Sequence, residues 1–274
     1  MAEARTSPPA MRARTAERSR RVFADLGSWT AFAVFALAVW EIASRLYAAP
    51  YLLPAPSAII RALTEDYGLV LYYAGITTQE VVLGFLFGSG IALLAAMLFV
   101  WLPRFLEDLL YRIVVTLNST PFVALASLIV VWFGLEIRSK VIVAGLYTFF
   151  AVLYHTHKEF ISVDPMRENL MDVYNATWLQ RMLLLKLPSA LPIIFTSLKG
   201  GVMAAVNGAI VGELFGAFEG LGYMILDSRY VGNTVRVFLA AVFCTLIGWV
   251  LLGLVTVAER LLLPWHVSLA RERS

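Results

Sequence analysis

The sequence is poor in charge and in cysteine. Asp, Glu, Lys and Arg make up 15% of the 274 residues, and apolar residues make up 60%, whereas soluble domains average about 25% charged residues. A soluble globule of this size needs a polar surface, and a disordered chain needs far less hydrophobicity, so both classes are excluded. Cys244 is the only cysteine, which excludes a disulfide within the chain. These absences indicate a membrane protein.

Residues that carry nucleotide or hydrolytic chemistry are also scarce. None of the four lysines follows a glycine, so the chain has no P-loop for a nucleotide phosphate. Neither a Gly-x-Ser-x-Gly nor a His-Glu-x-x-His motif is present. His155 and His157 lie close together but lack a third ligand nearby. We therefore expect no catalytic residue, no cofactor and no metal site.

Long apolar runs define the architecture, because a helix needs about 20 apolar residues to cross a bilayer. Glu41 and Arg45 interrupt the first run, but they are four residues apart and can pair on one helix face. An alternative for this first segment is a cleaved secretory signal that ends near Tyr47. We favour a retained helix because further spans follow it. The sequence thus predicts an all-α protein with six spans, at about 23–47, 81–102, 113–135, 141–157, 187–212 and 237–258.

The basic residues predict the orientation, since Lys and Arg accumulate in cytoplasmic loops. With six spans, 15 basic residues outside the spans fall on the side of the two termini and 5 on the other. We therefore expect a basic cytoplasmic tail over 1–22, a membrane domain over 23–265 and a cytoplasmic tail over 266–274. The five basic residues on the outer side are Arg61, Arg138, Lys140, Arg229 and Arg236.

The cytoplasmic loop 158–187 predicts two short helices. Asp164-Pro165 is a start signal, and Asn175 tolerates the left-handed conformation that ends a helix. Thr177 and Gln180 have the spacing of a capping box. Such a pair either packs on lipid or on the bundle, or it docks into a groove on a cytoplasmic partner. Its apolar positions at helical spacing are Leu170, Val173, Tyr174, Trp178, Leu179, Met182 and Leu183.

The outer segment 48–76 is too long for a plain turn. It carries three prolines before a partly amphipathic stretch over 57–73. A simple surface connection is the favoured interpretation, and the alternative is a helix along the outer surface that starts at Pro56-Ser57.

In loop 158–187 the sequence resembles the inner-membrane permease subunits of binding-protein-dependent ABC importers. Asn175-Ala176-Thr177 occupies the place of their Gly-Ala-Ser, and Leu187-Pro188 closes the segment. Over residues 50–265 the chain is similar to the nitrate, taurine and aliphatic-sulfonate branch of that family. The matching segments are Leu53-Pro54-Ala55-Pro56-Ser57-Ala58, Val131-Trp132-Phe133-Gly134-Leu135, Ser139-Lys140, Glu213-Leu214 and Gly220-Leu221-Gly222-Tyr223.

The resemblance implies a MetI-like fold and three kinds of partner. Two permease copies pair in the bilayer, cytoplasmic ABC ATPase subunits bind the loop and use the ATP, and an extracytoplasmic binding protein delivers the solute. The hallmark Glu-Ala-Ala is replaced here by Asn169-Leu170-Met171, so Glu168 or Asp172 is the candidate for the missing charge. The implied ATPase-coupling residues are Glu168, Asn169, Asp172, Asn175, Ala176, Thr177, Trp178, Leu179 and Met182.

Polar residues within the spans are costly in lipid and need a reason to be there. Pro121 breaks the third span and frees backbone groups, which indicates either a structural kink or a position on the solute pathway. Lys199 either snorkels to the cytoplasmic face or offers a cation to an anionic solute, and Glu213 can brace the outer gate or loop. The pathway candidates are Asn118, Ser119, Thr120, Lys199, Asn207 and Glu213.

Two Gly-x-x-x-Gly motifs, at 84–88 and 208–212, favour close helix packing in lipid. Packing within the chain is the simpler interpretation, and a dimer seam is the more specific one.

The predicted function is that of a permease subunit of an ABC importer in the inner membrane, with no nucleic-acid partner. The solute predicted by the resemblance is a small organic or inorganic anion of the nitrate, sulfonate or taurine type, or a pyrimidine precursor. The alternatives are a stand-alone secondary carrier or channel, which would not need a cytoplasmic docking loop, and an intramembrane hydrolase, which would need the motifs that are missing.

Overall fold

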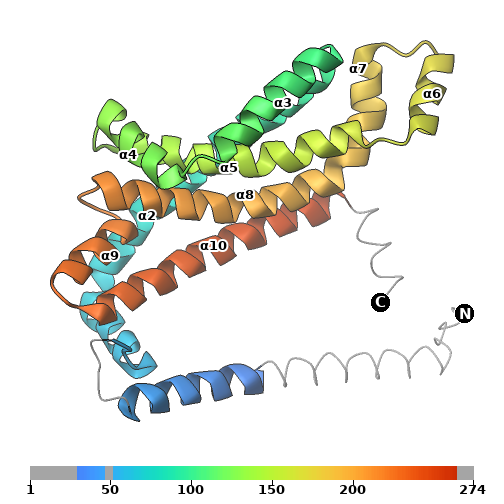
Figure 1. The fold of residues 1–274 in the computed structure, drawn as a ribbon. Helices are drawn as coiled ribbons and strands as arrows, with labels where there is room; N and C mark the ends of the chain where they lie inside the picture. Colours follow the sequence, from blue (N-terminus) through green and yellow to red (C-terminus); the bar gives the residue numbers. More distant parts are fainter. Residues whose placement is uncertain (1–29, 47–51, 264–274) are drawn as a thin grey trace, which may run out of the picture.

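The computed structural model describes residues 30–46 and 52–263, and every regular element in these ranges is a helix. Figure 1 shows α5, α8 and α10 running alongside one another, with α6 and α7 projecting at one end and α9 at the other. The predicted all-α class is confirmed for the described residues. After a first helix over 30–46, the elements are α2 (Pro56–Trp101), α3 (Arg104–Asn118), α4 (Phe122–Phe133), α5 (Ile137–Ile161), α6 (Pro165–Val173), α7 (Trp178–Arg181), the π-helix η1 (Met182–Lys186), α8 (Leu187–Gly216), α9 (Leu221–Tyr230) and α10 (Thr234–Leu262).

Four of the described helices are long and apolar enough to cross a membrane. They are α2, α5, α10 and the continuous helix from Trp178 to Gly216, and each contains or nearly contains one predicted span. The pair α3 and α4 makes a fifth if it is counted as one broken span. The first predicted span, 23–47, lies partly outside the described residues, so the count of six stays a prediction.

The break predicted at Pro121 is present, and it is sharp. Helix α3 ends at Asn118, α4 begins at Phe122, and the two axes differ by 91°. Pro121 has no N–H to donate, and its ring disfavours a helical conformation at Thr120. The third predicted span is therefore two helices at a right angle rather than one straight helix.

Helix α2 extends the second predicted span on its outer side. The favoured interpretation of a simple surface connection is wrong, because the helix begins at Pro56 and continues through a kink at Asp66 into the apolar part. Arg236 at the start of α10 donates two hydrogen bonds to the Asp66 carboxylate, at 2.7 and 2.8 Å. The outer segment is thus joined to the bundle by a two-pronged ion pair at the kink.

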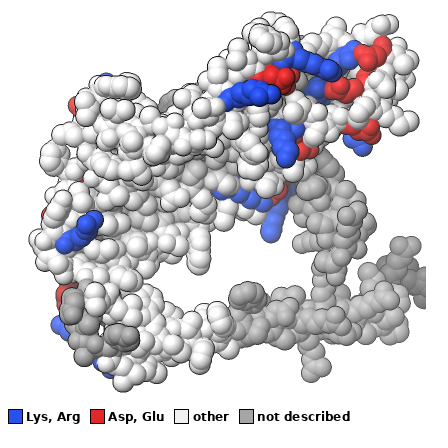
Figure 2. Space-filling view, in the orientation of Figure 1, with Lys and Arg blue, Asp and Glu red and all other residues white. Residues whose placement is uncertain are grey.

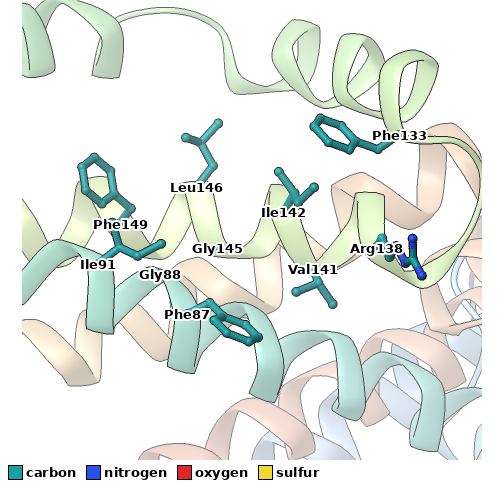
Figure 3. A pocket seen from close by; sticks show the side chains of 10 residues that line it. All are labelled: Phe87, Gly88, Ile91, Phe133, Arg138, Val141, Ile142, Gly145, Leu146 and Phe149. Carbon is teal, nitrogen blue, oxygen red and sulfur yellow. The ribbon is translucent and has the colours of Figure 1, made fainter.

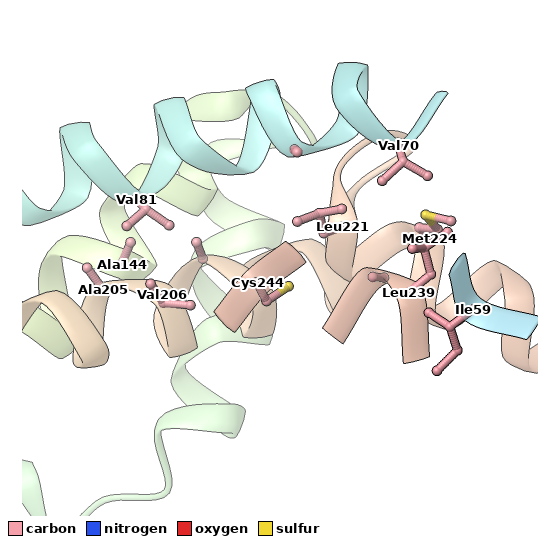
Figure 4. Packing of buried hydrophobic residues seen from close by; sticks show 13 residues of the cluster. Ile59, Val70, Val81, Ala144, Ala205, Val206, Leu221, Met224, Leu239 and Cys244 are labelled. Carbon is pink, nitrogen blue, oxygen red and sulfur yellow. The ribbon is translucent and has the colours of Figure 1, made fainter. Parts of the chain in front are cut away.

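The core nearer α9 is built from small and medium apolar side chains. Val81 of α2, Ala144 of α5 and Ala205 of α8 are fully buried against one another and against residues of α9 and α10. Figure 4 shows this cluster running from Val81 to Ile59 between the helices. A second buried cluster lies toward α6 and α7 and contains Phe160 and Met182.

Both Gly-x-x-x-Gly motifs pack inside the chain. A Cβ atom at Gly88 of α2 would lie 2.8 Å from the Thr148 Cβ of α5, and one at Gly208 of α8 would lie 2.7 Å from the Ala144 Cα. The glycines let α2, α5 and α8 approach closely. The packing interpretation is confirmed, and the dimer-seam interpretation is wrong for Gly84, Gly88, Gly208 and Gly212, because α5 of the same chain covers them.

The first helix, over 30–46, stands apart from the other helices in Figure 1. The predicted pair within it is present, with Arg45 Nη2 2.6 Å from Glu41 Oε1. Glu41 also accepts hydrogen bonds from Ser57, and the Trp40 ring lies 5.9 Å from the Phe238 ring. The helix touches the rest of the chain toward its C-terminal end, and Phe32 and Phe35 nearer its start are about two-thirds exposed.

Candidate functional site

The loop between α5 and α8 has the two-helix form that its sequence predicts. The Asp164 side chain caps α6 by accepting a hydrogen bond from the Met166 N–H at 2.9 Å, and Pro165 occupies the first turn. Asn175 ends the helix with φ at 48°, the one positive φ of a non-glycine residue in the described chain. Asn tolerates this left-handed conformation better than most residues, so it can replace glycine there.

The predicted capping box opens α7. The Gln180 side chain accepts a hydrogen bond from the Thr177 N–H at 2.8 Å, and the Thr177 hydroxyl accepts one from the Gln180 N–H at 3.4 Å. The chain then passes through η1 directly into α8. Pro188 cannot donate the hydrogen bond of a regular helical turn, and the wider π turn lies just before it. The sequence did not predict this π turn.

Two ion pairs tie α6 to the helix that follows it. Lys186 Nζ lies 2.6 Å from Glu168 Oε1, and Arg181 Nη2 lies 2.5 Å from Asp172 Oδ1. Lys186 also donates to the Phe160 carbonyl oxygen at the end of α5. The two carboxylates proposed as substitutes for the missing loop glutamate are therefore engaged within the loop itself.

One face of α6 is apolar and uncovered. Met166, Leu170, Val173 and Tyr174 follow helical spacing, and the exposed fractions of Val173 and Tyr174 are 77% and 75%. Asn169 is exposed on the same helix, and Leu179 is exposed on α7. Figure 2 shows that charged side chains gather over α3, α6 and α7, whereas most of the remaining visible surface is uncharged.

Three other predicted coupling residues are less accessible than this face, whereas Asn175 and Thr177 are exposed. Met182 is buried in the second cluster, with 2% of its surface exposed, so it anchors η1 rather than facing outward. The Trp178 ring lies 6.0 Å from the Trp101 ring at the end of α2. Ala176 is half-buried, and its carbonyl oxygen accepts a hydrogen bond from Arg181. The sequence missed Met166, although its spacing to Leu170 is helical.

A buried polar cluster lies at the opposite end of α8. Glu213 is fully buried and accepts a hydrogen bond from Thr77 Oγ1 of α2 at 2.6 Å and another from the Gly222 N–H. Thr77 Oγ1 accepts in turn from the Leu221 N–H at 2.9 Å. Glu80 and Lys140 are buried beside Glu213, with 2% of each exposed. We call Thr77, Glu80, Lys140 and Glu213 the outer polar cluster.

The outer polar cluster explains why Gly220-Leu221-Gly222 has a glycine at both ends, because a Cβ atom at either glycine would clash with Glu213. Gly220 has φ at 110°, which favours glycine, and a Cβ atom at Gly222 would lie 2.7 Å from Glu213 Oε2. Glu213 thus holds the start of α9 against α2 and α8. Sequence reasoning identified Glu213 and the glycines but missed Thr77 and Glu80, for which a polar residue at the edge of a predicted span was the only signal.

Lys199 has a partner that neither of its predicted roles included. Its Nζ lies 2.6 Å from Glu259 Oε2 of α10, so the charge is neutralised within the chain. Asn207 is exposed further along α8 and lines a pocket of about 300 Å³ with Cys244 and Trp249 of α10.

The predicted pathway residues do not form one cluster. Asn118, Ser119 and Thr120 lie at the break between α3 and α4, where Ser119 Oγ donates to the Val115 carbonyl oxygen at 3.2 Å. Lys199 and Glu213 are 14 residues apart on α8, or about 21 Å along a helix. The polar positions are distributed along the membrane domain.

His157, which lies next to loop 158–187, packs against α3. His157 Nε2 lies 3.0 Å from Glu107 Oε1 of α3, and its ring stacks on that of Tyr111. Within the described ranges, no three His, Cys, Asp or Glu side chains are grouped so that they could hold a metal ion.

These features define a class of protein: a multi-pass helical membrane protein with a capped, ion-paired helical loop projecting from one end. Comparison with known proteins places the chain more narrowly. Residues 84–265 match the family described as the binding-protein-dependent transport system inner membrane component, and the chain belongs to this family. Its members are transport subunits of ABC importers rather than enzymes, and the family implies an ATPase and a substrate-binding protein as partners.

Three relatives illustrate the match. The formylaminopyrimidine transport permease protein ThiX of Halalkalibacterium halodurans is 33% identical over 86% of this chain and 95% of its own length. An aliphatic sulfonates transport permease protein, SsuC, of Bacillus subtilis is 30% identical over 85% of each chain. The taurine transport system permease protein TauC of Escherichia coli is 27% identical over 90% of this chain and 91% of its own length. The branch predicted from the sequence is confirmed.

Proposed function

We propose that this permease is driven by a cytoplasmic ABC ATPase that binds the uncovered apolar face of α6, formed by Met166, Leu170, Val173 and Tyr174. This face is the observation that carries the proposal. Four exposed apolar side chains on one short helix favour binding, because covering them with a partner removes apolar surface from water. Asn169, Thr177 and Leu179 lie beside it and complete the contact. Glu168 and Asp172 hold α6 in position through Lys186 and Arg181.

The loop is mechanically connected to the outer side. The helix from Trp178 to Gly216 has 39 residues, or about 58 Å at 1.5 Å per residue, and it ends next to the outer polar cluster. A displacement of α6 is transmitted through Lys186 and η1 to α8, and from Glu213 to α9. This route connects closure of the ATPase on ATP with the outer gate.

The proposed assembly contains two copies of this chain in the inner membrane, two ABC ATPase subunits below and an extracytoplasmic solute-binding protein above. Both termini lie in the cytoplasm, in accord with the distribution of basic residues. The ATPase subunits hold and hydrolyse the ATP. The surroundings of the permease are the lipid bilayer and these partners, with no nucleic acid.

The solute is a small organic or inorganic anion of the sulfonate or taurine type, or a pyrimidine precursor, as the names of the relatives suggest. Asn118, Ser119, Thr120 and Asn207 are the polar residues that we place on its pathway. Lys199 and Glu213 bind other side chains of the chain, and we assign them to holding the helices that form the pathway.

The test compares one substitution on opposite sides of the membrane. Val173→Asp places a charge on the apolar face of α6, and Ile60→Asp places the same charge at an outer position that is 65% exposed. The tagged complex is purified from native membranes, and its vanadate-sensitive ATP hydrolysis is measured. We expect Val173→Asp to lose the co-purified ATPase activity by at least tenfold and Ile60→Asp to keep it. Equal activity in both variants would show that α6 is not the docking element.

A further inference from the structure

A groove lies between α2, α4 and α5. Its volume is about 790 Å³, and nine of its ten lining residues are apolar or glycine. The walls include Phe87 and Ile91 of α2, Phe133 of α4 and Phe149 of α5. This volume lies in the range of small-molecule sites, which are mostly apolar with a few polar groups that fix the ligand.

Two glycines form the floor of the groove where α2 and α5 meet. A Cβ atom on Gly88 of α2 would lie 2.9 Å from the Gly145 Cα of α5. The two glycines therefore let the helices pack closely beneath the apolar walls. Figure 3 shows Gly88 and Gly145 at the centre of the lining residues, with Arg138 at one end of the α5 row and Phe149 at the other.

Arg138 is the tenth lining residue and the only charged one. It has no ion-pair or hydrogen-bond partner among the described residues. The neighbouring cations differ: Lys140 donates to the Leu135 and Glu136 carbonyl oxygens, and Arg236 binds Asp66. An uncompensated guanidinium at the mouth of an apolar groove attracts an anion, which it can bind with two parallel hydrogen bonds.

We infer that this groove binds a small organic monoanion, with its sulfonate or carboxylate head at Arg138 and its apolar body along the groove past Ile142, in the direction of Phe149. Arg138 and Phe149 are 11 residues apart, or about 17 Å along a helix, so the groove accommodates a short chain or a single ring. The inference rests on the proposed function, because Arg138 at the outer end of α5 then stands where a solute enters. It adds an anion-binding station on the permease itself.

The experiment uses the full chain in nanodiscs of phosphatidylcholine and titrates it with 1-hexanesulfonate by calorimetry. We expect saturable binding that weakens at least tenfold in Arg138→Gln and is largely retained in Arg138→Lys. Arg229→Gln is the matched control, because Arg229 is an exposed outer arginine that lines none of the described pockets. Binding should also strengthen about fourfold for each methylene added between butanesulfonate and hexanesulfonate.

Three results would overturn the inference. Equal binding by wild type and Arg138→Gln would place the anion elsewhere, and equal binding of uncharged 1-hexanol would reduce the groove to an apolar surface. Loss of binding when one phosphatidylglycerol per chain is added would identify a lipid headgroup as the occupant. A circular dichroism spectrum and a monodisperse elution profile of Arg138→Gln that match those of the wild type would exclude misfolding as the cause. Val173→Asp should bind hexanesulfonate normally, so a failure of the groove and a failure of ATPase docking are seen separately.

Discussion

Thr77 satisfies two buried groups with one hydroxyl. It donates to Glu213 of α8 and accepts from the Leu221 N–H of α9, so three helices meet at a single side chain. The sequence offered only one signal for Thr77, a polar residue at the edge of a predicted span, because the bond to Glu213 joins residues 136 positions apart. Glu213 was recognisable because a carboxylate within an apolar run requires a partner.

Thr77→Val should therefore destabilise the protein more than the same substitution at the neighbouring Thr78. The substitution keeps the shape but leaves the Leu221 N–H without a partner and removes one of the hydrogen bonds to Glu213, which costs about 1–3 kcal/mol. Thr78→Val is the control, since Thr78 Oγ1 bonds only the Ala74 carbonyl oxygen of its own helix. Thermal unfolding in detergent should show a lower midpoint for Thr77→Val and little change for Thr78→Val. Equal midpoints would mean that the outer polar cluster does not hold α9.

At the scale of elements, loop 158–187 was the most predictable part of the chain. The cap at Asp164, the left-handed residue Asn175 and the capping box at Thr177 all depend on residues within a few positions of one another. These helix caps and helix ends can therefore be predicted from the local sequence alone. The burial of Met182 and the ion pairs of Glu168 and Asp172 depend on how α6 folds back on η1. Residue spacing alone did not reveal that fold-back.

The ion pair between Glu168 and Lys186 should hold α6 in place. Glu168→Lys sets two cations against each other, and amide hydrogen exchange in α6 should accelerate by up to about fivefold, since such partly exposed pairs contribute at most about 1 kcal/mol. The double variant Glu168→Lys with Lys186→Glu restores the attraction and should restore slow exchange. The control is the exchange of Arg61 and Glu65, an ion pair that lies within α2. Unchanged exchange in Glu168→Lys alone would rule out the pair as the element that holds α6.

At the scale of the whole molecule, the sequence predicted the apolar spans and the order in which they occur, because apolar length is set by the bilayer. It predicted a break at Pro121 but not the angle of 91° between the α3 and α4 axes. A proline interrupts the helical hydrogen bonds, but it does not determine the angle at which the next helix continues. The close packing of α2, α5 and α8 was indicated by glycine spacing. Which helices those glycines face required the three-dimensional structure.

The central claim is that α6 lies in the cytoplasm and is covered by an ATPase. The variants Val173→Cys and Ile60→Cys test it directly, because both positions are exposed and the native Cys244 is buried. In inside-out membrane vesicles stripped of the ATPase, a membrane-impermeant maleimide should label residue 173 and not residue 60. Adding back the purified ATPase should then protect residue 173. Labelling of residue 60 in these vesicles, or labelling of residue 173 that the ATPase leaves unchanged, would contradict the account.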